Sequence, residues 1–233
     1  MEGSMWGYDL AAGCFTVMSL TDKSHVVVEF GSQFFHLCVI VYSCFVLFAS
    51  GSTLPDNEVQ TLRQISSKLD IRQWNVNPSS CRTGQGLNIN YNNGSLSNVT
   101  CDCTFNSSTI CHVTIIELSL DLHGELPFEF ANLTYLSTLN LNRNYLNGTI
   151  PRAWASLPLV NLSLLGNLVT GTIPKEIGNI RTLEFLNLQD NKMEGPIPED
   201  LGNLVNLRRA LLGGNDYTGR LPDTFGNLKN LTD

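Results

Sequence analysis

The feature that most constrains this chain is a repeat of 23 or 24 residues in its C-terminal half. The segments LNLNRNYLNGTIP, LSLLGNLVTGTIP, LNLQDNKMEGPIP and ALLGGNDYTGRLP begin at Leu139, Leu162, Leu186 and Ala210. A period of this size is typical of a solenoid, in which one repeat cannot bury its own apolar edge and stacked neighbours bury it together. We therefore expect one core that runs through successive coils.

The shared pattern is L-x-L-x-x-N-x-L-x-G-x-I-P, followed by an apolar residue and G-N-L. L-x-L alternation predicts a short strand with one apolar face, and strands of successive coils can pair in parallel about 4.8 Å apart. The Asn can bond backbone groups that the turn leaves unpaired, and the Gly permits a conformation closed to other residues. Ile-Pro is expected to begin a second extended segment, because Pro fixes φ and cannot donate a hydrogen bond. The rest of the repeat is expected to return as a 3-10 or helical turn.

These patterns predict an α/β solenoid over residues 113–233, with short parallel strands and about five coils. The first coil, IELSLDLHGELPFEFANL, is one residue short between Leu118 and Gly124. A sixth coil begins at Leu231 and is expected to be truncated at Asp233.

The segment before the repeats, residues 52–112, is predicted to form an N-terminal cap. Its first part, DNEVQTLRQISSKL from Asp56 to Leu69, has apolar residues at steps of three and four, which predicts an amphipathic helix. A solenoid needs a cap because a terminal repeat otherwise exposes its core.

Four cysteines lie in this cap, at Cys81, Cys101, Cys103 and Cys111. An even number of cysteines before a repeat array favours a disulfide-bonded cap in an oxidising compartment. Three pairings are possible, and we favour Cys81–Cys101 with Cys103–Cys111. The alternative is a zinc site built from three thiols and His112, although the spacing lacks the paired Cys-x-x-Cys of structural zinc sites. We expect no metal and no cofactor.

The N-terminal region, residues 1–51, contains a continuous hydrophobic run of 13 residues from Leu37 to Ala49, followed by small residues. This pattern is typical of a secretory signal, and it is short for a bilayer span, which needs about 20 apolar residues. The 36 preceding residues are long for a signal and carry no basic cluster, so we expect an upstream false start, with Met5 or Met18 as other initiators. An uncleaved signal anchor is the alternative. We expect the chain to enter the secretory pathway and to act outside the cell or at its surface.

N-x-S/T sequons agree with this location, because about four would arise by chance in a chain so rich in Asn, Ser and Thr, and more are present. The candidate glycosylation sites are Asn93, Asn98, Asn106, Asn132, Asn147, Asn161 and Asn230.

The charge argues against nucleic acid as a partner, since the formal net charge is −7 and no basic stripe with interleaved aromatics occurs. Without residues 1–51, which hold four acids and one base, 17 acids and 13 bases remain, and this balance of −4 implies no charge-driven partner. No Ser–His–acid arrangement or carboxylate pair is apparent, and His112 and His123 are interpreted as packed or surface residues. We therefore expect a binding protein rather than an enzyme.

The outward positions between the inward leucines are the candidate binding residues, because solenoids bind partners across the extended concave surface that such positions form. The candidates are Arg143, Asn161, Ser163, Phe185, Asn187, Gln189, Asp190 and Arg209, together with Thr138, Asn140, Asn142, Leu165 and Leu211. The expected anchors are Phe185, Leu165, Arg143 and Arg209. Aromatic and Arg side chains are enriched among residues that dominate binding energy. The alternative is that each is an ordinary solvated residue, and a glycan on Asn161 would block part of this face.

The repeats and the cap resemble the ectodomains of plant leucine-rich-repeat receptor-like serine/threonine kinases. G-x-I-P and G-N-L in the coils are similar to the plant-specific class of leucine-rich repeats. The segments EVQTLRQISSKL, QWNVNPSSC and VTCDCTFNSSTICHV look like the N-terminal cap of the subfamily that carries a malectin-like domain after its repeats. LNRNYLNGTIPRAWASLPLVNLSLLGN is similar to the matching repeats there. The family order is signal, cap, repeats, malectin-like domain, membrane span and cytoplasmic kinase.

This resemblance implies an extracellular recognition module whose partner is a peptide, a cell-wall-derived ligand or another receptor's ectodomain. Kinase signatures do not occur in the chain, so the chain itself is expected not to be an enzyme. Two alternatives stay open. One is a membrane serine/threonine kinase encoded by a longer product. The other is a secreted leucine-rich-repeat inhibitor, a class that ends in a cap with its own cysteines, whereas no Cys follows Cys111 here.

Overall fold

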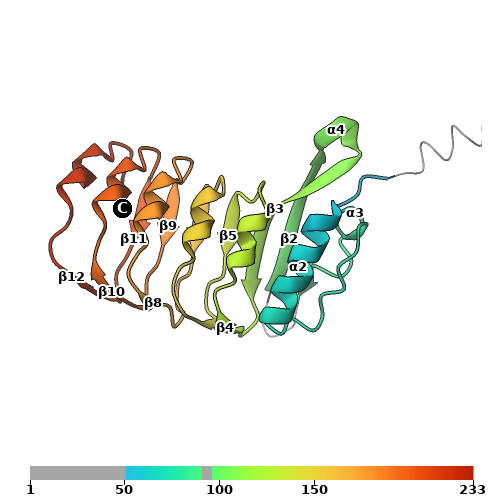
Figure 1. Cartoon of the computed structure of the whole chain (residues 1–233), viewed down its shortest axis with the longest axis horizontal. Helices are drawn as coiled ribbons and strands as arrows, with labels where there is room; N and C mark the ends of the chain where they lie inside the picture. The colour runs from blue at the N-terminus through green and yellow to red at the C-terminus, as the bar shows by residue number, and fades with distance from the viewer. Residues whose placement is uncertain (1–50, 91–95, 233) are drawn as a thin grey trace, which may run out of the picture. The chain divides into compact units, whose positions relative to one another are not determined.

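The L-x-L segments of the repeats form parallel strands that stack in register (Figure 1). The computed structural model describes residues 51–90 and 96–232, so the hydrophobic run from Leu37 to Ala49 and the sequon at Asn93 lie outside the described residues. The repeat strands are β5 (Thr138–Asn140), β7 (Asn161–Ser163), β9 (Phe185–Asn187) and β11 (Arg209–Leu211). Leu139, Leu162, Leu186 and Ala210 lie opposite one another in successive strands, which confirms the predicted solenoid.

The main sheet joins the cap to the repeats through one long strand. It has seven strands in the order β1-β2-β3-β5-β7-β9-β11, where β1 is Ile89–Asn90, β2 is Leu96–Thr104 and β3 is Ile110–Ser119. Strand β3 pairs antiparallel with β2 and parallel with β5, where Ile116 lies opposite Leu139. The boundary expected between residues 112 and 113 therefore falls inside β3, because this strand serves both the cap hairpin and the first coil.

A second set of short strands runs along the lower edge of the coils in Figure 1. Strand β4 (His123–Glu125) pairs with β6 (Tyr145–Asn147), and β10 (Lys192–Pro196) pairs with β8 (Thr170–Gly171) and β12 (Asp216–Thr218), all in parallel. These strands come before the Ile-Pro step, so the expectation that Ile-Pro begins the second extended segment is wrong. The repeat Gly lies within or directly after these strands and has a positive φ, such as 77° at Gly148 and 74° at Gly171.

Each Ile-Pro or Leu-Pro step instead stands immediately before a 3-10 helix, which confirms the predicted return of the chain. The helices are η1 (Phe128–Asn132), η2 (Arg152–Ser156), η3 (Lys175–Asn179), η4 (Glu199–Asn203) and η5 (Asp223–Asn227). The preceding prolines have φ between −60° and −67°. Pro suits this place because its fixed φ is compatible with a helix start, where the first N–H groups have no partner within the helix.

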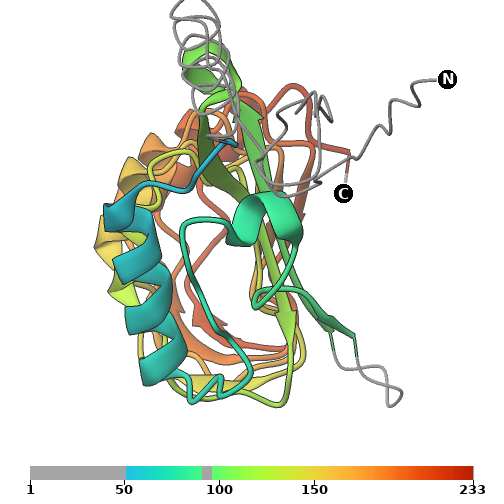
Figure 2. The same cartoon turned by 90° about the vertical axis from the view of Figure 1, so that its right-hand side faces the viewer.

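The core lies between the main sheet and the 3-10 helices, which occupy opposite sides of the coils (Figure 2). Leu139, Leu162 and Leu186 are all fully buried, and one hydrophobic cluster runs from Leu54 in the cap to Leu228 in the last complete coil. The stack therefore supplies the burial that one coil alone cannot.

The repeat Asn connects each coil to the coil before it. The Asn167 Oδ1 accepts a hydrogen bond from the backbone N–H of Leu146 at 3.0 Å, and its Nδ2 donates to the carbonyls of Leu141 and Leu164 at 2.9 Å each. Asn191 and Asn215 repeat this arrangement in the next coils. Because these bonds satisfy backbone groups in both coils, the inward Asn plays the predicted role.

The cap consists of a helix and a hairpin held by two disulfides. Helix α2 (Asp56–Lys68) buries Val59, Leu62 and Ile65, and its flank packs against η1. Cys81–Cys101 joins the short helix α3 (Ser80–Thr83) to β2, and Cys103–Cys111 closes the hairpin around α4 (Phe105–Ser108). This is the favoured pairing. Because the four thiols are joined in pairs, they cannot serve as the zinc ligands of the alternative reading.

Candidate functional site

Alternate residues of the repeat strands point away from the core and form two rows across the main sheet. The register places Ile115, Thr138, Asn161, Phe185 and Arg209 in one row and Glu117, Asn140, Ser163, Asn187 and Leu211 in the other. Among the described residues, the 3-10 helices pack on the other side of the core and so do not cover these rows (Figure 2). We call these rows, with Asn142, Leu165 and Gln189 that follow them, the sheet face.

Phe185 and Arg209 lie side by side in the first row, on neighbouring strands β9 and β11. The guanidinium carbon of Arg209 lies 5.5 Å from the centroid of the Phe185 ring, which is within the range of a cation–π interaction. Phe185 is half-buried and Arg209 is exposed, so both present surface to solvent. The pair combines the two residue types that most often dominate binding energy.

Ser163 and Asn187 lie in the second row but are only 4% and 5% exposed. The Ser163 hydroxyl donates to Asn142 Oδ1 at 2.6 Å, and Asn187 Oδ1 accepts from the backbone N–H of Gln189 at 3.0 Å. These two candidates therefore hold neighbouring groups in place. Sequence alternation indicates the side of the sheet that they occupy, but it does not reveal that polar residues of adjacent coils bond one another.

Arg143 and Asp190 lie beside the sheet face and not within its rows. Each occupies the turn that follows its strand, with a positive φ of 55° and 54°. Their backbone N–H groups donate to the carbonyls of Leu165 and Gly213 in the next coil, and their side chains are exposed. The repeat pattern grouped them with the strand residues because it does not mark where each strand ends.

The sequons of the described chain differ in how their side-chain amides are engaged. The amide donates to a neighbour in three of them: Asn98 to Glu117, Asn161 to Thr138 and Asn230 to the carbonyl of Val205, over 2.9, 3.1 and 2.9 Å. Asn106, Asn132 and Asn147 are exposed, and within the described part of the chain their amides have no hydrogen-bond partner. Asn161, on the sheet face, is thus bonded to the neighbouring strand.

A buried pair that joins α2 to β3 was missed by sequence analysis. Glu58 is 2% exposed; its Oε1 lies 2.5 Å from His112 Nδ1, and its Oε2 accepts from the backbone N–H of Val113 at 2.9 Å. The rings of Phe105 and Tyr135 pack on His112 with centroids 4.8 and 3.9 Å away. The available signal was the position of Glu58 four residues before Leu62, on the apolar side of an amphipathic helix.

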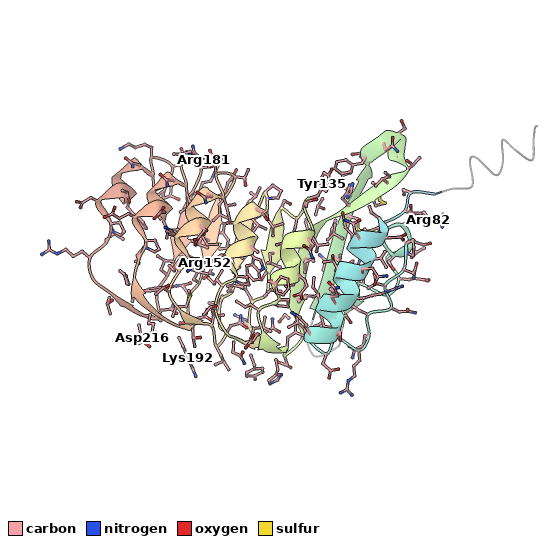
Figure 3. The ribbon with its side chains drawn as sticks, viewed as in Figure 1. Arg82, Tyr135, Arg152, Arg181, Lys192 and Asp216 are labelled. Atoms are coloured by element: carbon pink, nitrogen blue, oxygen red, sulfur yellow. A yellow bond between two sulfur atoms is a disulfide. The ribbon has the colours of Figure 1, made fainter. Side chains whose placement is uncertain are left out.

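A hollow of about 280 Å³ opens on the coils away from the sheet face. Its lining includes Pro174, Pro196 and Pro198 with Arg152, Lys175 and Glu176, and Arg152 is labelled in Figure 3. The Arg152 guanidinium lies 3.7 Å from Glu176 and is exposed, so this pair is held loosely. Within residues 51–90 and 96–232, no group of His, Cys, Asp and Glu side chains is placed to hold a metal ion. No helix in that part is both long and apolar enough to cross a bilayer.

Comparisons with known proteins agree with this fold. The leucine-rich-repeat family model matches residues 135–157 and 182–204, which correspond to the second and fourth coils. The chain is 44% identical over 137 residues to the probable LRR receptor-like serine/threonine-protein kinase At1g53430 of Arabidopsis thaliana. That match covers 57% of this chain and 13% of the relative, so the chain spans a small part of the relative's length.

Solved structures with the same fold include two receptor ectodomains. One is the LRR ectodomain of the plant membrane receptor kinase GASSHO1/SCHENGEN3 from Arabidopsis thaliana in complex with CASPARIAN STRIP INTEGRITY FACTOR 2. It has a TM-score of 0.58 and 33% identity over 74% of this chain and 20% of that chain. The other is the plant peptide hormone receptor RGFR1 in complex with RGF2, with a TM-score of 0.50 and 32% identity over 51% of this chain and 19% of that chain. The chain is thus a leucine-rich-repeat protein whose relatives are plant receptor-like kinases.

Proposed function

We propose that this leucine-rich-repeat chain, whose relatives are plant receptor-like kinases, is an extracellular recognition module that binds a peptide across its sheet face. The observation that carries the proposal is the sheet face itself, which the 3-10 helices leave free and which is built from strands of four successive repeats and the cap strand β3. An extended surface with side chains at regular spacing suits an extended ligand, which can contact several coils at once. The two similar solved structures described above are complexes of proteins with the same fold, one with RGF2 and one with CASPARIAN STRIP INTEGRITY FACTOR 2.

Phe185 and Arg209 are the proposed anchors of this contact. An aromatic ring buries a large apolar area on binding, and the guanidinium beside it adds a positive charge. The two side chains already lie together across adjacent strands, so part of their order exists before a ligand binds. We expect the ligand to carry an apolar group that packs on Phe185.

The parent protein in this proposal is a membrane serine/threonine kinase of the malectin-like-domain-containing subfamily, and the module acts at the cell surface. The cap segments that resemble this subfamily support the choice of parent. The two disulfides of the cap support an oxidising, extracellular location. The kinase activity belongs to the longer product, and the recognition step belongs to the chain described here.

The test is a binding selection followed by substitution. The full chain, secreted from plant cells and immobilised, is used to select peptides from a displayed library of plant secreted-protein segments. Phe185→Ala and Arg209→Ala are each expected to weaken binding of a selected peptide about 30-fold, which corresponds to a loss of about 2 kcal/mol. Isothermal titration calorimetry of the synthetic peptide measures this loss.

Lys192→Ala is the matched control, since Lys192 is an exposed cation on the lower edge, away from the sheet face (Figure 3). It is expected to leave the affinity unchanged. If the selected peptides bind the three variants as tightly as the unchanged chain, the sheet face is not the recognition surface. If no library peptide binds and the immobilised chain captures a purified receptor ectodomain instead, the partner is a protein and the peptide proposal is wrong.

A further inference from the structure

Tyr145 and Asn147 stand next to each other on the exposed side of β6. Residues two apart in a strand point to the same side, and the Leu146 between them is fully buried. Tyr145 is 49% exposed, so much of its ring is open to solvent. The strand thus presents an aromatic ring and an amide together to solvent.

The ring of Tyr145 is supported from the neighbouring coil. It stacks on His123 of β4, with centroids 4.7 Å apart and planes 17° from parallel. The register of the two strands sets this contact, because His123 lies directly opposite Tyr145. The stacked rings make a flat platform, which we call the ring platform, and Asn147 projects beside it.

Asn147 begins the sequon Asn147-Gly148-Thr149. Its amide has no hydrogen-bond partner within the described part of the chain, and Thr149 is also exposed. Gly148 has a φ of 77°, which turns the chain immediately after Asn147. The side-chain nitrogen is therefore accessible for modification next to the ring platform.

The other exposed sequons lack an exposed ring two residues before their Asn. Phe130, two residues before Asn132, is fully buried, and the residue two before Asn106 is Thr104, which has no ring. The same spacing occurs in sequence at Tyr91 and Asn93, which lie outside the described residues. Among the sequons that the structure describes, a free amide with an exposed ring two residues before it on the same face of a strand is found at Asn147.

We propose that Asn147 carries an N-linked glycan whose first sugar packs on the ring of Tyr145. One face of an N-acetylhexosamine carries C–H groups, and these make dispersion and electrostatic contacts with the negative face of an aromatic ring. The inference rests on the proposed extracellular location, because the modification takes place in the secretory pathway. It explains why Tyr145 is left exposed on a surface strand.

The transfer needs a donor of one chemical class, a polyisoprenyl-diphosphate oligosaccharide. A bond forms between Asn147 Nδ2 and the anomeric C1 of the first sugar, while the bond between C1 and the phosphate oxygen breaks. The lipid diphosphate leaves with the electron pair of that bond, and the amide loses one proton to the solvent. No oxidation or reduction takes place.

The glycan would affect the contact between two coils as well as the single residue that carries it. Because His123 backs Tyr145 from the neighbouring coil, a sugar that covers Tyr145 strengthens the contact between the first and second coils. Interfaces between neighbouring coils set the stability of a solenoid. The glycan would also occupy the lower edge and leave the sheet face open to a ligand.

The first measurement is the occupancy of each sequon in the full chain secreted from plant cells, by mass spectrometry of intact glycopeptides. We expect a glycan on Asn147. A glycan on Asn106 or Asn132 with none on Asn147 would overturn this inference and leave the extracellular location standing. A chain that stays inside the cell without any glycan would overturn the location, and this inference with it.

The second measurement is a cycle of four proteins: the unchanged chain, Thr149→Ala, Tyr145→Ala and the double variant. Thr149→Ala removes the sequon while keeping Tyr145 and Asn147. We expect this substitution to lower the Tm in both backgrounds. The loss should be about 2–4 °C larger when Tyr145 is present than when residue 145 is Ala. Tyr145→Phe keeps the ring and should restore the full effect. Equal losses of Tm in both backgrounds would refute the packing of the sugar on Tyr145.

Discussion

Glu58 and His112 show how one buried pair can fix the cap to the repeats. Glu58 belongs to α2, and His112 belongs to β3, the strand that also begins the first coil. Removing a carboxylate from water is costly, and here the cost is offset because His112 and the backbone N–H of Val113 each bond one oxygen. The helix is therefore tied to the strand on which the stack is built.

Substitution of Glu58 by Ala is expected to lower the free energy of unfolding by about 3–5 kcal/mol, because it leaves His112 and a buried N–H without their partner. Urea unfolding followed by circular dichroism measures the change. Glu194→Ala is the control, since Glu194 is exposed on β10, and it should change stability by no more than about 0.5 kcal/mol. Similar effects of the two substitutions would contradict the role of the buried pair.

Tyr217 gives a prediction about alkaline pH. Its hydroxyl donates to Met193 Sδ at 3.3 Å, and burial raises the pKa of Tyr217 above its ordinary value near 10. Above about pH 10 the unfolded chain releases this proton while the folded chain keeps it, so stability falls as the pH rises. Tyr217→Phe should reduce this fall between about pH 9 and pH 11 in urea unfolding. A pH dependence identical to that of the unchanged chain would contradict burial of the hydroxyl.

At the scale of the elements, η3 and η4 approach the following 3-10 helix through glycine. A Cβ on Gly178 of η3 would lie 2.2 Å from the carbonyl oxygen of Asp200 in η4, and one on Gly202 would lie 2.4 Å from Thr224 Cβ in η5. Neither Gly has a positive φ, so these two coils need Gly here for close approach and not for backbone conformation. The Gly of G-N-L in η3 and η4 is thus explained by the spacing between coils, whereas Ala131 and Ala155 hold the same position in η1 and η2.

Gly178→Ala is expected to cost about 1–3 kcal/mol of stability, because the added methyl group must push η3 away from η4. Gly226→Ala is the matched control: it occupies the same position in η5, where no atom lies within 4 Å of an added Cβ. It should be neutral or stabilising by up to about 1 kcal/mol, since Ala restricts the unfolded chain. Thermal unfolding of both variants decides the point, and a stable Gly178→Ala protein would contradict the close packing of η3 and η4.

The repeat pattern predicted most of these elements because the same residues recur in step. The strands follow L-x-L, and the 3-10 helices follow the Pro of each coil. The second set of strands was placed wrongly because a Pro φ near −65° suits both an extended segment and a helix start. The double role of β3 could not be predicted either, because it depends on pairing with β2 and β5 at opposite edges, which is not a local signal.

At the scale of the whole molecule, different surfaces of the coils have different proposed roles. The sheet face presents Phe185 and Arg209, the lower edge carries Asn147 beside the ring platform, and the hydrophobic core lies between the sheet and the 3-10 helices. Sequence alternation identified which residues point outward in β5, β7, β9 and β11. It could not show that Ser163 is bonded to Asn142, because that contact depends on the spacing between coils, or that Asn187 accepts from the backbone two residues on.

The central claim is that the sheet face binds the ligand and the lower edge does not. Hydroxyl-radical footprinting of the secreted glycoprotein, with and without a selected peptide, tests it most directly, because ring oxidation reports the exposure of each aromatic side chain. We predict that the peptide strongly reduces oxidation of Phe185 and leaves oxidation of Tyr135, Tyr145 and Phe128 unchanged. Protection of Tyr145, Tyr135 or Phe128 with no change at Phe185 would contradict the account.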